Sequence, residues 1–374
     1  MQLGRSIPSS SSSSISSDRS ATFSCSASSS TADRAPSAQS DAAATLSRGI
    51  VYTTHEGNSW EATLAPSGER VGGFEMNRIS LCRVARFFFF PFSSSRALTF
   101  FALHLLLLPL RTGTTILVDP WLVGALTFGD TPWLYEGKKK LLPKQDLAAV
   151  CARTDLLLIS QALPDHAHGP TLRALPDKSI PVVCSPAAEA AVRGAGFTDV
   201  TPLAIGAKTE TAGGKVRVTA TAGALVGPPW ATRENGFLIE EIGTVKKPLR
   251  IYYEPHCDWG EGALEGLASS SSSSSLAGVD AVVTPAVSQK LAGYPLVMGE
   301  ENLIKLVRAL MPAALIPLVN AEFEQSGPLA AAIQQVGDGG VAAVEAKLRG
   351  AGLGGRTRYY APAPPGTPLA IEIA

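Results

Sequence analysis

Paired cysteines are absent from this sequence. Its five cysteines are widely separated, at Cys25, Cys82, Cys151, Cys184 and Cys257. This spacing provides neither a Cys-rich zinc site nor a disulfide framework, and it fits free or buried thiols in a reducing compartment.

An excess of charge of either sign is also lacking. The chain has 32 basic and 32 acidic residues, so its formal net charge is zero, and charged residues make up only 17%. With no recognisable nucleic-acid-binding motif either, we expect no nucleic-acid partner. The 374 residues, 45% of them hydrophobic, are enough for one large domain or two ordinary ones with a substantial core.

Residues 1–47 are rich in serine and alanine and contain arginines but few acids. This composition cannot bury a core and is typical of a plastid transit peptide. We therefore expect a chloroplast protein, in the stroma, whose mature chain begins near residues 40–48. An untargeted disordered tail is the alternative.

Residues 66–112 differ from the sequence around them. They contain two apolar runs, at 87–92 and 97–108, and a serine run between these. The second run is shorter than the roughly 20 residues that span a bilayer, so membrane association through 87–110 is the less favoured interpretation. We interpret 66–112 as an insertion in a domain that covers 48–374, and translated intron sequence in a gene model is one origin for it.

The remaining sequence alternates between strand-like and helical patterns. Apolar runs predict strands at 116–118, 156–159, 181–184, 216–221, 237–241, 250–253, 281–283 and 314–318, and helices are expected at 170–175, 187–195 and 300–310. The three strands between 215 and 254 leave no room for helices. This mixture predicts an α/β fold of two packed mixed sheets with helices on the outside.

Polar residues follow four of these strands. Asp119 follows the first, and its carboxylate can orient a neighbouring ligand or cap the turn before Pro120. Asp165, His166 and His168 follow the strand at 156–159, and two of the five histidines of the chain therefore stand close to an aspartate. Such groups can bind a divalent ion, whereas in the simpler interpretation Asp165 caps the following helix and the histidines are surface residues.

The other two clusters follow later strands. Glu254 and His256 are two residues apart, so in an extended chain they share a face and can form the second half of a metal site. Asn320 and Glu322 share a face by the same rule, although a turn-forming Asn320 is an equally simple explanation.

The order of these elements resembles the metallo-β-lactamase fold superfamily, and the resemblance covers most of 48–374. It is closest to plastid and cyanobacterial metallo-hydrolase-like members, which share the variant Gln161-Ala-Leu163-Pro-Asp165-His166-Ala-His168 and the Gly-Asn-Ser-Trp sequence at 57–60. The resemblance implies an αββα sandwich with a site at one edge of its sheets. It also implies that Gln161 and Leu163 replace the first two histidines of the family's His-x-His-x-Asp-His motif.

This departure predicts a degenerate site, because leucine has no lone pair and glutamine is a poor zinc ligand. One divalent metal ion, zinc or else iron or manganese, would be held by Asp165, His166 and His256, with His168 as a further ligand; no metal at all is the alternative. Asp165 and Glu254 are the candidate catalytic groups, and Asp119, Gln161, Asn320 and Glu322 are further pocket candidates.

Two functions remain open from the sequence. One is a hydrolase with a single metal ion, acting on an ester, thioester, lactone or phosphoester through metal-activated water. The other is a non-catalytic protein of the same fold that binds a metabolite or a partner. In both cases the expected partner is a small molecule, whose identity lies in loops and site shape that the sequence does not reveal.

Overall fold

Two seven-stranded β-sheets carry the fold. The computed structural model describes residues 49–55, 58–65, 113–226, 230, 232–242, 248–260, 262–264, 278–318, 323–361 and 363–373. In the first sheet the strand order is β20 (Leu369–Glu372), β1 (Gly49–Thr54), β2 (Trp60–Ala65), β3 (Thr114–Val118), β6 (Leu156–Ile159), β7 (Val182–Cys184) and β8 (Val200–Pro202). In the second it is β19 (Arg358–Tyr359), β16 (Ala314–Leu318), β13 (Ala281–Pro285), β12 (Arg250–Tyr253), β11 (Asn235–Glu241), β10 (Val216–Ala222) and β9 (Lys208–Thr211).

Both sheets are mixed, and in the same manner. β20, β1, β2 and β3 pair antiparallel, whereas β3, β6, β7 and β8 pair parallel. In the second sheet β9 to β12 pair antiparallel, and β12, β13, β16 and β19 pair parallel. Every strand expected from the apolar runs is present, and the predicted pair of mixed sheets is confirmed.

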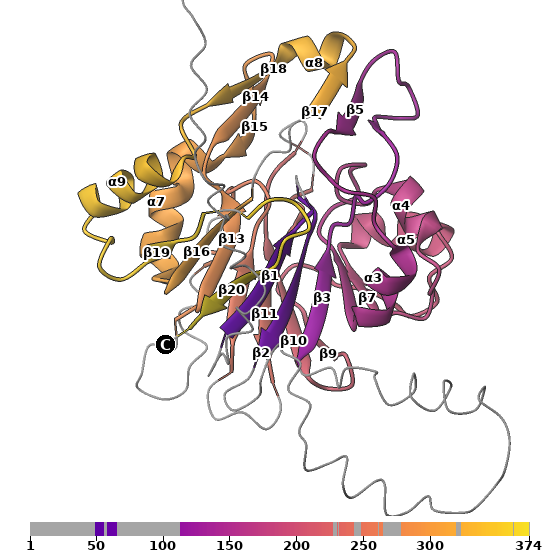
Figure 1. Ribbon diagram of the computed structural model, residues 1–374, viewed down its shortest axis with the longest axis horizontal. Coiled ribbons are helices and arrows are strands. Elements are labelled where there is room, and N and C mark those ends of the chain that lie inside the picture. The colour runs from indigo at the N-terminus through magenta and orange to yellow at the C-terminus, as the bar shows by residue number, and fades with distance from the viewer. Residues whose placement is uncertain are drawn as a thin grey trace, which may run out of the picture. The chain divides into compact units, whose positions relative to one another are not determined.

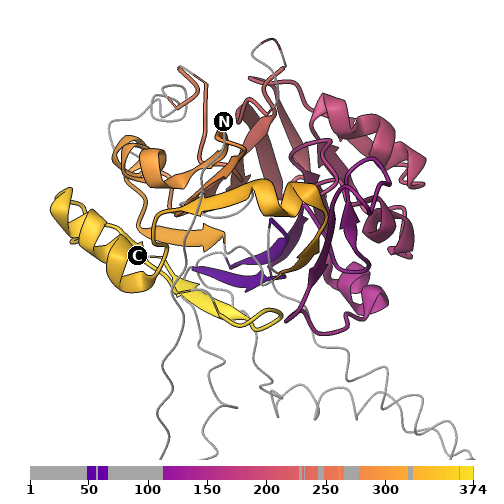
Figure 2. The ribbon, with the colours of Figure 1, turned by 90° about the horizontal axis from the view of Figure 1, so that it is seen from above.

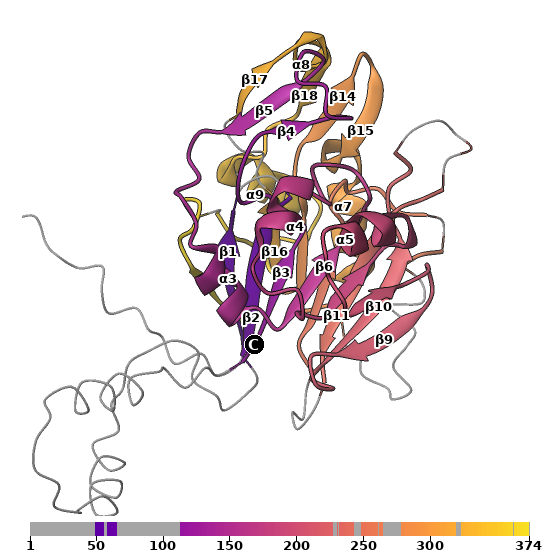
Figure 3. The same cartoon turned by 90° about the vertical axis from the view of Figure 1, so that its right-hand side faces the viewer.

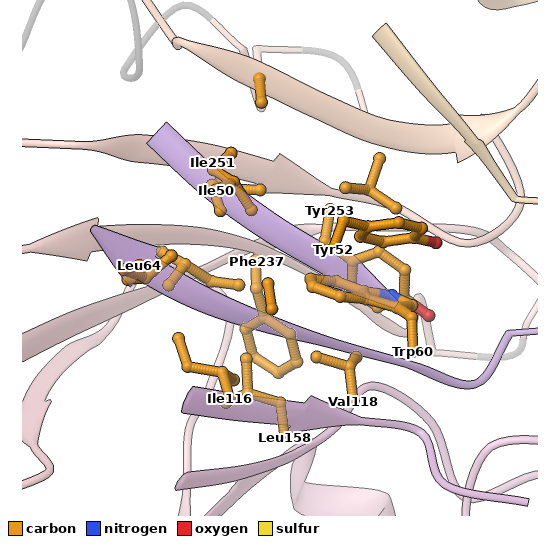
Figure 4. Packing of buried hydrophobic residues seen from close by; sticks show 14 of the residues in the cluster. Ile50, Tyr52, Trp60, Leu64, Ile116, Val118, Leu158, Phe237, Ile251 and Tyr253 are labelled. Carbon is orange, nitrogen blue, oxygen red and sulfur yellow. The ribbon is translucent and has the colours of Figure 1, made fainter. Parts of the chain in front are cut away.

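The core lies between the two sheets (Figure 4). Ile116 and Val118 of β3 pack in it, while Leu117 between them packs with the helices on the other face. Strands that are buried on both faces in this way read as continuous apolar runs, which is why they were detectable in the sequence. The indole of Trp60 lies 5.5 Å from the ring of Tyr52 and 5.4 Å from that of Tyr253, and joins the two sheets near the site.

Helices cover the outer faces of both sheets (Figures 1 and 2). On the first sheet these are α3 (Leu147–Arg153), α4 (Gly169–Ala174) and α5 (Glu189–Gly194), the last preceded by the 3₁₀ turn η1 (Pro186–Ala188). On the second they are α7 (Gly299–Leu310) and α9 (Val341–Gly350). The buried side chains of α7 include Leu303, Leu306, Val307 and Leu310, the spacing of a one-sided apolar stripe. The three helices expected from the sequence are therefore present.

Two small sheets, which the sequence patterns did not predict, lie together at one end of the sandwich (Figures 1 and 3). One consists of β4 (Leu126–Thr127), β5 (Glu136–Lys139) and β17 (Phe323–Ser326). The other consists of β14 (Ser288–Leu291), β15 (Tyr294–Met298) and β18 (Ile333–Val336), and α8 (Pro328–Ala332) directly precedes β18. These strands are short and half-exposed, so their sequences lack the apolar runs of the large sheets.

The expected insertion, 66–112, and the expected transit segment, 1–47, lie outside the described residues. The strands on either side of 66–112 are neighbours, because β2 pairs antiparallel with β3 and Leu64 stands opposite Thr114. The chain therefore leaves and re-enters the sheet at adjacent positions. Among the described helices, none has the length and apolar character needed to cross a membrane.

Candidate functional site

The candidate site lies where three core strands end. Asp119 follows β3, Ser160 and Gln161 follow β6, and Glu254 and His256 follow β12. β3 and β6 are parallel neighbours, so their carboxyl ends meet at one edge of the first sheet. The structure thus brings together side chains that are more than 130 residues apart in the sequence.

Asp119 is the centre of a buried hydrogen-bond network. Its Oδ1 accepts from the backbone N–H of Ser160 (2.7 Å), and its Oδ2 accepts from the hydroxyls of Ser160 (2.5 Å) and Tyr253 (2.6 Å). The Nδ1 of His166 lies 2.7 Å from the same Oδ2. Asp119 has a φ of +43°, a left-handed conformation that costs free energy in a non-glycine residue and is held here by these contacts.

His166 is fully buried beside two carboxylates. Burial by itself lowers its pKa, but the charges of Asp165 and Asp119 and the hydrogen bond to Asp119 outweigh this and raise the pKa to about 9. The Nε2 atom lies 3.5 Å from Oδ2 of Asp165 and 3.1 Å from the side-chain amide nitrogen of Asn58. The aspartates on both sides therefore favour the imidazolium form of His166, in which Nε2 donates, and this form requires the amide oxygen of Asn58 rather than its nitrogen to face the ring.

His256 lies next to His166, but its surroundings favour the neutral ring instead of the cation. The two ring centroids are 5.3 Å apart, with the planes at 65°. Burial and then the positive charge of His166 lower the pKa of His256 well below its usual value. The side-chain amide of Gln161 donates to its Nδ1 over 2.9 Å, so the proton of the neutral ring is on Nε2.

Glu254 does not share an extended face with His256, and that prediction is wrong. The chain turns after Tyr253, and Cys257 has a φ of +53°. The Oε2 of Glu254 accepts from the backbone N–H groups of His256 (3.2 Å) and Asp258 (2.6 Å), so the carboxyl group holds this turn. Burial raises the pKa of Glu254 to about 8, against the lowering effect of the hydrogen bond from Asp258.

His168 caps a helix, and both of its ring nitrogens are engaged in hydrogen bonds. It is the N-cap of α4, where its Nδ1 contacts Thr171 Oγ1 at 2.9 Å and its Nε2 lies 3.1 Å from the carbonyl oxygen of Ala125. Burial lowers its pKa to about 4. The structure therefore places His168 as a structural residue, and it takes the capping role that the simpler interpretation had given to Asp165.

A pocket of about 740 Å³ opens beside the network. Asn58, Asp165 and His256 line the part of the pocket next to the network. The other described lining residues come largely from the segment between β3 and β5, which includes β4, and from β15, β17, α8 and β18. The two small sheets and α8 therefore build the wall of this pocket. This volume is in the range of small-molecule sites.

Three residues of the site were not among the candidates predicted from the sequence: Asn58, Ser160 and Tyr253. Asn58 belongs to the Gly-Asn-Ser-Trp sequence that carries the family resemblance, which was the available signal. Tyr253 ends an apolar strand and looks like core, and its hydrogen bond to Asp119 follows only from the packing of the two sheets. Asn320 and Glu322 lie outside the described residues.

The donor set of the described residues does not fit a tightly held divalent ion. Within this part of the chain no group of three or more His, Cys, Asp or Glu side chains is arranged to hold a metal. Asp165 Oδ2 and His166 Nε2 are two potential donors, whereas catalytic zinc sites use three protein ligands. A ligating histidine must also be neutral, and the carboxylates beside His166 favour its cation.

Several solved structures are similar to this chain. Similar solved structures include Igni18, described as a novel metallo hydrolase from Ignicoccus hospitalis (TM-score 0.48, 14% identity, 87% of this chain and 100% of that one). A possible metal-dependent hydrolase from Veillonella parvula has the same TM-score and identity and covers 87% and 99%. An isothiocyanate hydrolase from Delia radicum gut bacteria has a TM-score of 0.45 at 14% identity and covers 70% and 93%.

No curated protein matches the sequence. The family pattern of the beta-lactamase superfamily domain, however, matches residues 98–319, which is more than half of the chain. Together with the two mixed sheets and their outer helices, this match confirms the fold that the resemblance implied. The protein belongs to the β-lactamase superfamily.

Proposed function

We propose that this protein binds a small organic molecule in the 740 Å³ pocket without a resident metal ion. One observation carries the proposal: the polar groups at the former metal positions are bonded to one another. Gln161, in place of the family's first motif histidine, donates to His256, and His166 is bonded to Asp119. Side chains engaged in this way hold the floor of a binding pocket.

Electrostatics supports the same assignment. Asp119 and Asp165 are two carboxylates close to one buried edge, and uncompensated buried charges are strongly destabilising. The imidazolium of His166 lies between them, 2.7 Å from Asp119 and 3.5 Å from Asp165. Its charge provides the compensation that a metal cation provides in a metal-loaded relative.

The test combines metal analysis with a ligand screen. The full chain is purified, reconstituted with zinc, iron or manganese, and analysed for bound metal. Less than about a tenth of an equivalent is expected, since the described residues do not complete the set of three protein ligands that a catalytic zinc site uses. A thermal-shift screen of small molecules is then run with and without a chelator, and the ligand-induced shifts are expected to be the same.

A matched control shows that the assay detects a metal site. The double variant Gln161→His, Leu163→His restores the family's motif in the same loop, and we expect it to retain more metal than the wild type. Wild-type protein with a full equivalent of metal, or ligand binding abolished by the chelator, contradicts the proposal.

A hydrolase with a single metal ion is the second candidate. It is favoured by one distance, the 3.5 Å between Asp165 Oδ2 and His166 Nε2 beside the pocket, which two ligands of a shared ion also show. The site would need at least one further protein ligand. Glu322→Ala, compared with wild type in the same metal analysis, tests whether that ligand comes from residues after β16.

We also propose that the protein resides in the plastid stroma. The serine- and arginine-containing composition of residues 1–47 supports this location. A fluorescent protein fused after residue 60 is expected in plastids, and a diffuse cytosolic signal contradicts the proposal.

A further inference from the structure

The described lining of the pocket contains one negatively charged side chain and no lysine or arginine. Among the described residues that line it, Asp165 is the only one with a formal charge. His256 is the one histidine in the described lining, and its Nδ1 accepts a hydrogen bond from the side-chain amide of Gln161, as a neutral ring does. An anionic ligand group would therefore meet no cation at the pocket surface and would face a carboxylate.

Asp165 has unused capacity to accept hydrogen bonds. Its Oδ2 lies 3.5 Å from both His166 Nε2 and the amide nitrogen of Asn58, which is the outer limit of a hydrogen bond. Its Oδ1 is buried and has no hydrogen-bond partner in the described part of the chain, whereas the side chain as a whole is 28% exposed, so the weakly engaged Oδ2 is the oxygen left for a ligand. Asp165 and Asp119 together carry two negative charges against the single positive charge of His166, which leaves this end of the pocket negative.

Apart from Asp165 the described lining is uncharged, and it combines apolar side chains with the polar side chains of Gln289, Gln325, Ser326 and Gln335. Leu296, Val297 and Leu318 line one part, and the rings of Phe128 and Tyr135 line another, with their centroids 5.2 Å apart. Aromatic rings attract ammonium groups through their negative faces. The ring of Trp121 also lines the pocket, but Lys139 Nζ already lies 4.6 Å from its centroid. The rings that can contact a ligand ammonium group are therefore those of Phe128 and Tyr135.

We infer that the pocket binds an apolar organic amine, whose ammonium group pairs with Asp165 and whose hydrocarbon body packs on the apolar side chains of the lining. This inference rests on the proposed function above and adds the ligand class to it. It excludes carboxylates and phosphoesters as ligands of this pocket. A neutral alcohol fits the walls but gains only a weaker hydrogen bond at Asp165, because charge-assisted hydrogen bonds are about twice as strong as neutral ones.

Three eight-carbon probes that differ only in the head group test the inference. Octylamine, 1-octanol and octanoate are titrated into the full-length protein at pH 7.5 by calorimetry. We expect octylamine to bind at least tenfold more tightly than octanoate, with octanol between them. Asp165→Asn is expected to weaken octylamine binding about tenfold and to change octanol binding less than twofold. Asp130→Asn, at an exposed aspartate outside the pocket, is the matched control and leaves all three affinities unchanged.

A second variant keeps the test decisive if Asp165→Asn fails to fold. Val297→Lys places a cation in the lining of the pocket, and we expect it to weaken octylamine binding and strengthen octanoate binding. Equal binding of all three probes, tighter binding of octanoate, or no binding of octylamine overturns the inference. If octylamine binds in the expected order but only in the absence of chelator, the proposed metal-independent function fails while the ligand class stands.

Discussion

The buried charge network around Asp119 makes the most demanding prediction. In the variant Asp119→Asn the shape of the side chain is kept, but the charge is lost. Oδ2 accepts from two hydroxyls and from His166, and Oδ1 accepts from a backbone N–H, so an amide nitrogen at either position faces a donor. The imidazolium of His166 also loses its nearest counter-charge.

The magnitude follows from the pKa of His166. A rise from the usual 6.5 to about 9 corresponds to roughly 3 kcal/mol of stabilisation by proton binding, at about 1.4 kcal/mol per pH unit. Loss of one partner of a buried pair typically costs 3–5 kcal/mol. We therefore expect Asp119→Asn to lower the free energy of unfolding at pH 6.5 by about 3–5 kcal/mol.

The pH dependence provides an independent check. Because the pKa of His166 is higher in the folded protein, its stabilisation is complete below about pH 6.5 and is lost as the pH rises to about 9. Glu254, whose pKa is raised to about 8, adds a decline of the same sign, but it is present in wild type and variant alike. His256, whose pKa is lowered in the folded protein, adds a small rise in stability just above pH 6.5, where the unfolded ring is still partly protonated, and this rise is present in wild type and variant alike.

The assay is urea unfolding at pH 6.5, 7.5 and 8.5 for the wild type, Asp119→Asn and the exposed control Asp130→Asn. The wild type and the control are expected to lose stability over this range, and Asp119→Asn to lose clearly less. A variant within 1 kcal/mol of the wild type, or parallel pH profiles, refutes the reasoning.

Three further predictions concern separate parts of the molecule. Replacement of 66–112 by an Asn-Gly turn joins paired strands, so the free energy of unfolding is expected to stay equal or to rise by up to about 3 kcal/mol, the loop-closure entropy that is saved, and the melting temperature is expected to follow it. A variant that does not fold shows that the segment is needed. His168→Ala should cost about 1 kcal/mol in urea unfolding through loss of the α4 cap, while metal content and probe affinity stay unchanged; a change in either contradicts the structural role. Glu254→Gln should flatten the decline in stability between pH 4.5 and 8, because burial penalises the carboxylate; an unchanged pH profile contradicts this.

The amino-acid sequence by itself determined the central strands of the two large sheets and the helices α4, α5 and α7, but not the edge strands β8, β9, β19 and β20. Runs such as 156–159 are apolar on both faces because both faces are covered, so their burial can be predicted from their composition. It was also readable that Gln161 and Leu163 provide no imidazole, since this depends only on residue type. The small sheets were not, because their strands are short and half-exposed and pair with segments far along the chain, as β5 does with β17.

Only the tertiary structure decided what the polar residues at the strand ends do. Asp119, His166 and Tyr253 come from different strands and loops, and their charge states depend on distances that no spacing in the chain encodes. His168 and Glu254 looked like ligands from their residue types, yet the fold uses one to cap a helix and the other to hold a turn. Residue type determines which bonds a side chain can make, and packing determines which of its partners are within reach.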